Sequence, residues 1–430
     1  MRGWSPERVA QAAGARLVES GGRSDGPLRA VIDSRHARRG DLFVGLPGER
    51  VDGGRFAADV LAAGAWGVLV GEGWTGIDAD DGAILVAADP LAALQRLATA
   101  WRRELGAQVI GVTGSTGKTS TKDLLAAMVD QQRRVVATPA NLNTEIGLPL
   151  TILGAPADTE VLVLEMAMRG RGQIAELAQI AEPDVGVIVN VGPVHLELLG
   201  SVEAVAATKA ELIAELPAGG TAIVPAGEPL LEPHLRADVT TVTFGPGGDV
   251  DALPEGLEVP FTSAHMARNA LAALAAARAV GVEPAGALTV ELSALRGQRI
   301  EAAGGIVVIN DCYNANPMSM RAALDDLAAS ASASRRRVAV LGDMLELGPE
   351  ERRFHEEIGA HARAVGVDLL VTVGPLAAAM ADEFGGETHA VATAPEAAAL
   401  LPGLLAEGDT VLVKGSRGVG LEVVAEGLTA

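Results

Sequence analysis

The stretch Gln108-Val-Ile-Gly-Val-Thr-Gly-Ser-Thr-Gly-Lys-Thr-Ser120 decides the central fold of this chain. A short apolar strand runs into a glycine-rich loop, and a helical pattern over about 118–130 leaves it. The amides of such a loop can cradle phosphates, its lysine can reach the β- and γ-oxygens, and its threonine can bind Mg²⁺. We therefore predict ATP contacts from a continuous run of residues: Thr113, Gly114, Ser115, Thr116, Gly117, Lys118, Thr119 and Ser120.

The glycine spacing of this loop departs from the standard phosphate-binding pattern. That pattern asks for glycine at position 112, where this chain has Val112. The glycines lie instead at 111, 114 and 117. The sequence thus predicts a variant phosphate-binding loop. The alternative is a glycine turn with a surface lysine, which the uninterrupted order of strand, loop and helix disfavours.

Strands and helices alternate on both sides of this loop. The 430 residues suffice for about three domains at roughly 150 residues each. Continuous apolar runs at 161–164 and 185–189 indicate a parallel sheet covered on both faces, and similar runs recur after residue 301. We expect an α/β protein with a substrate-binding domain (1–88), a central P-loop ATPase domain with a parallel sheet (89–300) and a C-terminal Rossmann-like domain (301–430).

The charge balance and cysteine content narrow the classes of function. Lys and Arg number 34 against 55 Asp and Glu, a net charge of −21 that is poorly suited to gripping nucleic acid or an anionic membrane. The single cysteine, Cys312, excludes an internal disulfide and suits a reducing compartment. No signal peptide or apolar span is evident, so we expect a soluble cytoplasmic protein.

Lysine is rare in this chain. Only four of the 34 basic residues are lysines, namely Lys118, Lys122, Lys209 and Lys414. Lys209 lies in an apolar helical stretch, where we expect it to be partly buried or to snorkel. Burial lowers the pKa of a lysine, and a neutral amine can react with CO₂ to form a carbamate. The sequence permits that modification without requiring it.

Two further polar residues follow predicted core strands. Glu165 comes directly after an apolar strand, so we expect it at the carboxyl edge of the sheet beside the glycine loop, as a Mg²⁺ ligand. The alternative interpretation is that Glu165 is an ordinary glutamate at the start of a helix. His195 lies in the loop after the next strand. A lone histidine is more often structural than a ligand, but this loop position favours a functional role.

Together these segments resemble the Mur ligase family, which makes bacterial cell-wall precursors. The front of the chain, with Asp33-Ser-Arg and Gly40-Asp-Leu-Phe-Val-Gly-Leu-Pro-Gly-Glu-Arg-Val-Asp-Gly53, resembles the UDP-binding domain of that family. The resemblance spans essentially the whole chain. Besides the glycine loop, the matching stretches are Thr138-Pro-Ala-Asn-Leu-Asn-Thr-Glu-Ile-Gly147, Leu164-Glu-Met-Ala-Met-Arg-Gly170, Gly192-Pro-Val-His-Leu-Glu197, Asp311-Cys-Tyr-Asn-Ala-Asn-Pro317, Leu341-Gly-Asp-Met-Leu-Glu-Leu-Gly348 and Val413-Lys-Gly-Ser-Arg417.

The resemblance implies an ATP-dependent amide ligase. ATP would phosphorylate the terminal carboxylate of a UDP-linked muramoyl tripeptide, and the amine of D-alanyl-D-alanine would displace the phosphate. The third residue of the tripeptide, meso-diaminopimelate or lysine, stays open. Two other interpretations remain. One is another amide ligase of the superfamily, of folylpolyglutamate or cyanophycin type, and the other is a P-loop switch or regulatory ATPase without a ligase product.

The resemblance also assigns roles to single residues. Lys118, Thr119 and Glu165 would hold the γ-phosphate and one Mg²⁺, while His195 and a carbamylated Lys209 would help to hold a second ion. We expect small-molecule substrates, no nucleic-acid or membrane partner, and a monomer. Met266 stands where asparagine is common, so we assign the adenine contact to Asn269. The remaining expected contacts are Tyr313 and Asn314 for the nucleotide, and Ser34, Arg35, Asn141, Asn143, Thr144, Lys414 and Arg417 for the substrates.

Overall fold

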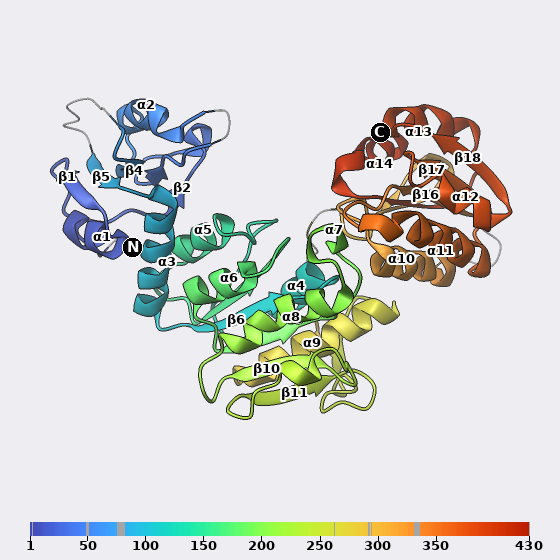
Figure 1. Cartoon of the computed structure of the whole chain (residues 1–430), viewed down its shortest axis with the longest axis horizontal. Coiled ribbons are helices and arrows are strands. Elements are labelled where there is room, and N and C mark those ends of the chain that lie inside the picture. The colour runs from blue at the N-terminus through green and yellow to red at the C-terminus, as the bar shows by residue number, and fades with distance from the viewer. Residues whose placement is uncertain are drawn as a thin grey trace.

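Three α/β units follow one another along the chain in the computed structural model (Figure 1). The structure describes residues 1, 3–48, 51–74, 82–261, 263–290, 293, 295–330 and 336–429. The first and third units lie at opposite ends of the molecule, and the central unit joins them. Each unit has a sheet of its own. Within these residues, every helix is too short or too polar to cross a bilayer.

The first unit is built on a five-stranded sheet in the order β1-β5-β4-β3-β2. Ser5 caps the first helix by accepting a hydrogen bond from the amide of Arg8, and Pro6 opens that helix. The edge strand β2 is short, because its pairing with β3 is confined to two residues. The elements are α1 (Pro6–Ala13), β1 (Arg16–Glu19), β2 (Ala30–Val31), β3 (Leu42–Val44), α2 (Ala57–Ala62), β4 (Gly67–Gly71) and β5 (Ala83–Ala87).

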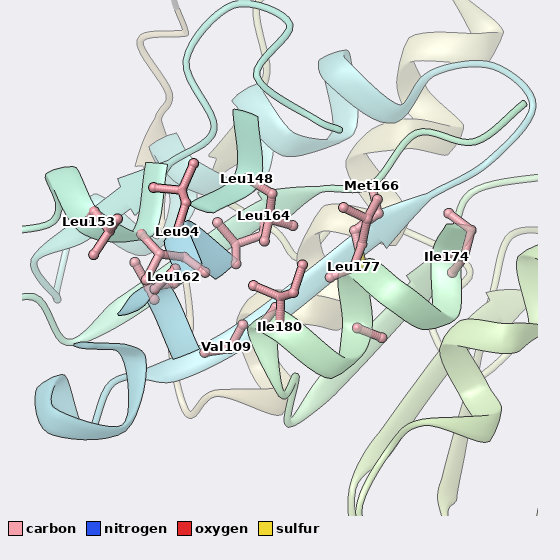
Figure 2. Close-up of a cluster of buried hydrophobic side chains, with 14 of the residues drawn as sticks. Leu94, Val109, Leu148, Leu153, Leu162, Leu164, Met166, Ile174, Leu177 and Ile180 are labelled. Atoms are coloured by element: carbon pink, nitrogen blue, oxygen red, sulfur yellow. The ribbon is translucent and has the colours of Figure 1, made fainter. Parts of the chain in front are cut away.

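The central unit has six parallel strands in the order β11-β10-β9-β6-β8-β7. Their side chains alternate between two buried clusters, one under α4 and α9 and one under α3, α5, α6 and α8. Figure 2 shows the second cluster, in which Leu94 lies near Leu162 and Leu177 lies near Met166. The strands are β6 (Gln108–Thr113), β7 (Val135–Ala137), β8 (Val161–Glu165), β9 (Val185–Ile188), β10 (Thr221–Pro225) and β11 (Thr240–Phe244).

The helix that follows the glycine loop starts where the sequence pattern indicates. The helix predicted over 118–130 is α4 (Lys118–Asp130), and α9 is an alanine-rich helix that ends at Ala279. A small parallel pair, β12 (Leu257–Glu258) and β13 (Gly286–Ala287), flanks α9. The other helices are α3 (Pro90–Leu105), α5 (Gly147–Gly154), α6 (Gln173–Ala181), α7 (Leu196–Leu199), α8 (Val202–Ala214) and α9 (Ala264–Ala279).

The third unit has a sheet in the order β14-β15-β19-β16-β17-β18, in which β14 is antiparallel to its neighbour. Helices α10, α11 and α12 cover one face and α13 and α14 the other, the doubly wound pattern expected. The elements are β14 (Gln298–Glu301), β15 (Val307–Asn310), α10 (Pro317–Ser330), β16 (Arg337–Gly342), α11 (Glu351–Ala364), β17 (Leu369–Val373), α12 (Ala379–Phe384), β18 (Glu387–Val391), α13 (Ala394–Leu400), β19 (Thr410–Lys414) and α14 (Glu422–Thr429).

The connections between the units lie near the expected domain limits. Helix α3 packs against α1 of the first unit and against α5 and α6 of the central unit, so it belongs to both interfaces. Strand β14 begins at Gln298, just before the limit placed between 300 and 301. The domain limits themselves remain predictions. Glu49 and Arg50, inside the quoted front motif, lie outside the described residues.

Candidate functional site

The glycine loop lies at the carboxyl edge of the central sheet. It connects the end of β6 to the start of α4, the arrangement that the quoted sequence predicts. Gly117 has a φ of +74°, and a Cβ atom there would lie 2.7 Å from Oδ1 of Asn269, so this position requires glycine. The first turn of α4 has no side-chain cap, and its amides can therefore receive an anion.

Asn190, just beyond the end of β9, fixes the shape of this loop. Its Oδ1 accepts a hydrogen bond from the amide of Thr116 at 2.9 Å, and its Nδ2 donates to the Thr116 hydroxyl at 2.8 Å. The hydroxyl of Ser115 contacts both backbone groups of Gly192, at 2.9 and 3.1 Å. Thr116 and Ser115 thus hold the loop to the neighbouring strand, which leaves the amides of the helix start for a ligand.

Lys118 and Glu165 form the charged centre of the site. Lys118 Nζ donates to the carbonyl of Gly114 at 2.8 Å, and burial lowers the pKa of this lysine while the Glu165 carboxylate opposes that shift. Glu165 is 1% exposed. Its carboxylate accepts from the Thr119 hydroxyl and from Asn143 Nδ2, both at 2.8 Å. A carboxylate and a hydroxyl held together in this way are hard oxygen ligands of the kind that Mg²⁺ prefers.

His195 lies beside this centre, at the start of α7. It has a φ of +53°, which is uncommon for a residue with a side chain. Its Nδ1 bonds Glu346 of the third unit at 2.5 Å. Burial lowers the pKa of His195, the Glu346 carboxylate opposes the shift, and Lys118 and Lys209 add to it. The two lysines are therefore close enough to act electrostatically on this imidazole.

Lys209 is buried more deeply than the sequence indicates. It is only 2% exposed, because α8 packs against α6 and the sheet, so the expected snorkelling is wrong. Burial, together with the nearby charge of Lys118, holds the pKa of Lys209 well below its ordinary value. Within the described part of the chain its amine has no hydrogen-bonding or ionic partner.

The predicted metal ligands do not form a ready-made acidic cluster. No three His, Cys, Asp or Glu side chains of the described residues come together in a way that could hold a metal ion. Thr119 and Glu165 are in direct contact, whereas His195 is bonded to Glu346. A metal ion bound here would need further oxygen ligands, such as those of a phosphate or a lysine carbamate.

The third unit contributes a loop after β15. Lys414, 2% exposed, donates from Nζ to Asp311 Oδ2 at 2.5 Å and to the carbonyl of Asn314 at 3.0 Å. These bonds hold the loop in place, and the expected substrate contact of Lys414 stays a prediction. Arg417 lies nearby with a largely exposed guanidinium, 3.7 Å from Glu422. Arg417 is therefore the freer of the two expected substrate contacts.

Cys312 lies in the same loop but is buried. Its thiol donates to Asn310 Oδ1 at 2.8 Å, and burial raises its pKa to about 11. A thiol with so high a pKa is a poor nucleophile near neutral pH. Cys312 is thus a packed residue of the loop, as its small size favours.

A cleft of about 2230 Å³ connects these groups. Its described lining residues run from Ser115 to Gly418, so the central and third units form it together. The expected contacts in the lining are Ser115, Thr116, Gly117, Lys118, Thr119, Ser120, Asn141, Asn143, Thr144, Glu165, His195, Asn269, Tyr313, Asn314, Lys414 and Arg417. Thr113 is buried at the end of β6, and Lys209 is buried behind the lining.

The first-unit contacts lie away from this cleft. Ser34 and Arg35 form a short 3-10 turn capped by Asp33. Arg35 is mostly exposed and pairs with Asp33 at 2.6 Å, and its hydrogen bond lowers the pKa of that carboxyl. An exposed arginine of this kind is accessible to a ligand, but it already has an anionic partner.

Sequence reasoning missed three residues of the site. Asn190 directly follows the apolar run 185–189, and Glu346 lies inside the quoted stretch 341–348. These positions, at a strand end and in a motif loop, are the signals that could have identified them. Arg296 precedes β14 and stacks its guanidinium 4.1 Å from the ring centre of Tyr313. It also acts electrostatically on Lys118. No local signal distinguishes Arg296 from the many other arginines of the chain.

Known protein families account for most of the chain. Residues 112–277 match the Mur ligase middle domain, and residues 295–417 match the domain described as "Mur ligase, glutamate ligase domain". The UDP-N-acetylmuramoyl-tripeptide–D-alanyl-D-alanine ligase of Synechocystis sp. is 40% identical over 93% of this chain and 91% of its own length. The enzyme of the same name from Bacillus subtilis is 38% identical over 93% and 92%.

Solved structures give the same result. A crystal structure of MurF from Acinetobacter baumannii superimposes with a TM-score of 0.85, at 30% identity and with 99% of this chain and 98% of that chain covered. MurF ligase from Thermotoga maritima, solved in complex with ADP, has a TM-score of 0.78 at 30% identity, with 93% and 96% covered. By its sequence and by its three-unit fold, this chain belongs to the Mur ligase family.

Proposed function

We propose that this protein is an ATP-dependent ligase that joins D-alanyl-D-alanine to UDP-N-acetylmuramoyl-tripeptide, the activity in the names of its relatives. The γ-phosphoryl group of ATP would pass to the terminal carboxylate of the tripeptide, giving ADP and an acyl phosphate. The amine of the dipeptide would then attack the acyl carbon. The bond from that carbon to the phosphate oxygen would break, releasing phosphate and a proton.

One observation carries this proposal. The glycine loop, Lys118 and the Thr119–Glu165 pair open into a single cleft that the third unit completes. Phosphoryl transfer depends on positioning and on neutralising phosphate charge, which a lysine and oriented amides supply. Lys118 is the cation best placed for the γ-phosphate, because it lies at the start of α4 beside the loop amides and lines the cleft.

The oxygen ligands around Glu165 fit a Mg²⁺ ion. Glu165 and Thr119 would hold it, and Asn143 fixes the carboxylate from the other side. A bound Mg²⁺ would withdraw charge from the phosphate oxygens at this point. We further propose that His195 takes part in a second ion site, with its Nε2 as the ligand atom.

Lys209 is the residue we propose to be carbamylated. Its neutral amine would attack CO₂, forming a nitrogen–carbon bond and releasing one proton, so that an uncharged amine becomes a carbamate anion. The buried amine without a partner and the nearby Lys118 both favour the uncharged form that reacts. The carbamate oxygens would restore electrostatic balance beside Lys118 and complete the ligands around His195.

The substrates would lie along the two interfaces of the central unit. We propose that Ser34 and Arg35 contact the UDP group and that Asn141 and Thr144 contact the peptide end. Arg417, exposed in the cleft, is suited to the carboxylate of the incoming dipeptide. We also propose that the enzyme acts in the cytoplasm, where its nucleotide substrates are found. A monomer stays a prediction, which light scattering would test.

Omission of substrates tests the proposal most directly. Purified protein would be given ATP and Mg²⁺ alone, then with UDP-N-acetylmuramoyl-tripeptide, with D-alanyl-D-alanine, or with both. Phosphate release, and formation of a new amide detected by mass spectrometry, should both require the two substrates. Lys118→Ala should abolish both products. Parallel assays with meso-diaminopimelate or lysine as the third residue identify the tripeptide. ATP hydrolysis at a rate that is unchanged by either substrate would instead support the interpretation as a regulatory ATPase.

A further inference from the structure

Two residues with unusual backbone conformations meet across the boundary between the central and third units. His195 and Glu346 have φ values of +53° and +64°, and only five non-glycine residues of the described chain have a positive φ. Left-handed backbone is unfavourable for residues with a Cβ atom, and such conformations gather at functional positions. Here both side chains point at each other, with His195 Nδ1 2.5 Å from Glu346 Oε2.

The backbones around this pair are also joined. The amide of Glu197 donates to the carbonyl of Glu346 at 3.3 Å. A Cβ atom on Gly348 would lie 3.4 Å from the backbone of Glu197, so the two loops approach closely. Leu196 packs against the buried clusters of both units. The pair is thus part of an extended contact between two loops rather than an isolated surface ion pair.

A second basic residue holds the same carboxylate. Arg169 Nε lies 3.8 Å from Glu346 Oε1, while Oε2 contacts His195. Both basic residues come from the central unit, and the carboxylate comes from the third. The side chains of His195 and Glu346 are 24% and 35% exposed, so the pair is only partly open to water.

The chemistry of the pair decides which imidazole nitrogen carries the proton. A carboxylate only accepts hydrogen bonds, so the nitrogen facing it must carry hydrogen. Nδ1 faces Glu346, and a neutral His195 therefore has a bare Nε2 with a free lone pair. Histidines that bind metal ions commonly have this arrangement, with a carboxylate on the other ring nitrogen to fix the ring and its tautomer.

We propose that Glu346 is a positioning residue that holds His195 in the Nδ1–H tautomer, with Nε2 directed as a ligand to the phosphate end of the cleft. This proposal rests on the proposed function, since it gives His195 a metal ion to bind. Because Glu346 belongs to the third unit, His195 acquires the correct tautomer only when the third unit is docked. Ion binding by the central unit is thereby made dependent on the position of the third.

The first test reads the tautomer directly in the full chain without metal or nucleotide. Histidine ring nitrogens are labelled with ¹⁵N, and long-range ¹H–¹⁵N spectra are recorded for the unaltered protein and for Glu346→Gln, Glu346→Ala and Glu350→Ala. Assignment uses the signal lost in His195→Gln. The unaltered protein should show Nδ1–H. Glu346→Gln should also show it, because the glutamine side-chain oxygen still accepts a hydrogen bond from Nδ1. The control Glu350→Ala should match the unaltered protein, because Glu350 pairs with Arg353 on the surface. Glu346→Ala should shift the signal toward Nε2–H.

The second test measures Mg²⁺ dependence of ligation in the same four proteins. Glu346→Ala should raise the half-saturating Mg²⁺ concentration by roughly 10- to 100-fold, the usual effect of removing such a carboxylate. Glu346→Gln should recover most of that loss, and Glu350→Ala should match the unaltered protein. Thermal unfolding and X-ray scattering would verify that each variant is folded and docked.

The outcomes separate this inference from the proposed function. An unchanged tautomer in Glu346→Ala would overturn the inference whatever the enzyme does. Faster ligation by Glu346→Ala would also overturn it, since the contact would then be a latch that withholds His195. If the unaltered protein ligates nothing, the proposed function fails, while the spectra still decide whether Glu346 controls the His195 tautomer.

Discussion

Lys209 on α8 and Lys414 at the end of β19 are equally buried, each 2% exposed, but their surroundings are opposite. Lys414 is bonded to the carboxylate of Asp311 and the carbonyl of Asn314. Lys209 has no partner among the described residues, and the charge that acts on its pKa is the like charge of Lys118. Burial alone therefore does not determine the role of a lysine. The role also depends on the charged and polar groups around its amine.

This contrast explains two different roles for one residue type. A buried lysine that is bonded to a carboxylate fixes local structure, here the loop that carries Tyr313. A buried cation next to another cation is better off uncharged, and an uncharged amine is a nucleophile. Lys414 thus holds a loop in place, whereas Lys209 is the lysine that we propose to be carbamylated. The same substitution at the two positions should have effects of opposite sign.

The largest expected effect is on catalysis at Lys209. Lys209→Ala and Lys209→Arg should both lower ligation by about 1000-fold or more, equivalent to about 4 kcal/mol of transition-state stabilisation, because neither can form a carbamate. Formate should restore part of the activity of Lys209→Ala and none of that of Lys209→Arg. Initial rates with both substrates measure this. Near-normal turnover by Lys209→Arg would make Lys209 an ordinary cation, and the contrast would disappear.

The next effect is on stability at Lys414. Lys414→Met should destabilise the third unit by roughly 3 kcal/mol, because it leaves the Asp311 carboxylate partly buried without its cation. Urea unfolding followed by a probe in the third unit would measure it. The double variant Lys414→Met with Asp311→Asn should recover part of the loss. A neutral single variant would show that the pair contributes little.

A smaller effect of opposite sign is expected at Lys209. In the absence of CO₂ and nucleotide, Lys209→Met should stabilise the central unit by about 1 kcal/mol, because an apolar side chain replaces a buried amine that has no partner. The measurement is again urea unfolding, with Lys414→Met as the matched comparison. A loss of stability as large as that of Lys414→Met would mean that Lys209 has a stabilising partner in solution.

The smallest effect is the pH dependence of that gain. The folded-state pKa of Lys209 is below its ordinary value of 10.5, so between the two values the unfolded chain binds more protons and stability rises with pH. The destabilisation caused by burying this amine is largest below the folded-state pKa, and it decreases as the pH rises toward 10.5. The advantage of Lys209→Met should therefore shrink as pH rises, as read from unfolding midpoints. A constant advantage would contradict the lowered pKa.

Much of the site could be predicted because its parts are local in sequence. Strand, loop and helix around 108–130 are contiguous, and the structure confirms the elements at nearly the predicted limits. Other details required the packed fold. Asn269 was expected at the adenine, and the structure places its amide against Gly117, where the close approach of α9 to the loop requires glycine. Arg296 lies more than 170 positions after Lys118 and Glu346 comes from the third unit, so no local pattern could place them beside Lys118 and His195.

The sequence by itself determined that this chain has three α/β units, a variant phosphate-binding loop and four lysines in a chain that otherwise uses arginine. These features follow from apolar periodicity and from residue types at short spacing, which depend on a few neighbours along the chain. Only the tertiary structure decided that Lys414 is bonded to a carboxylate, that Lys209 has none among the described residues, and that His195 meets Glu346 from the third unit. Charge interactions depend on distance in space, and folding brings together residues that lie about 100 to 150 positions apart in sequence.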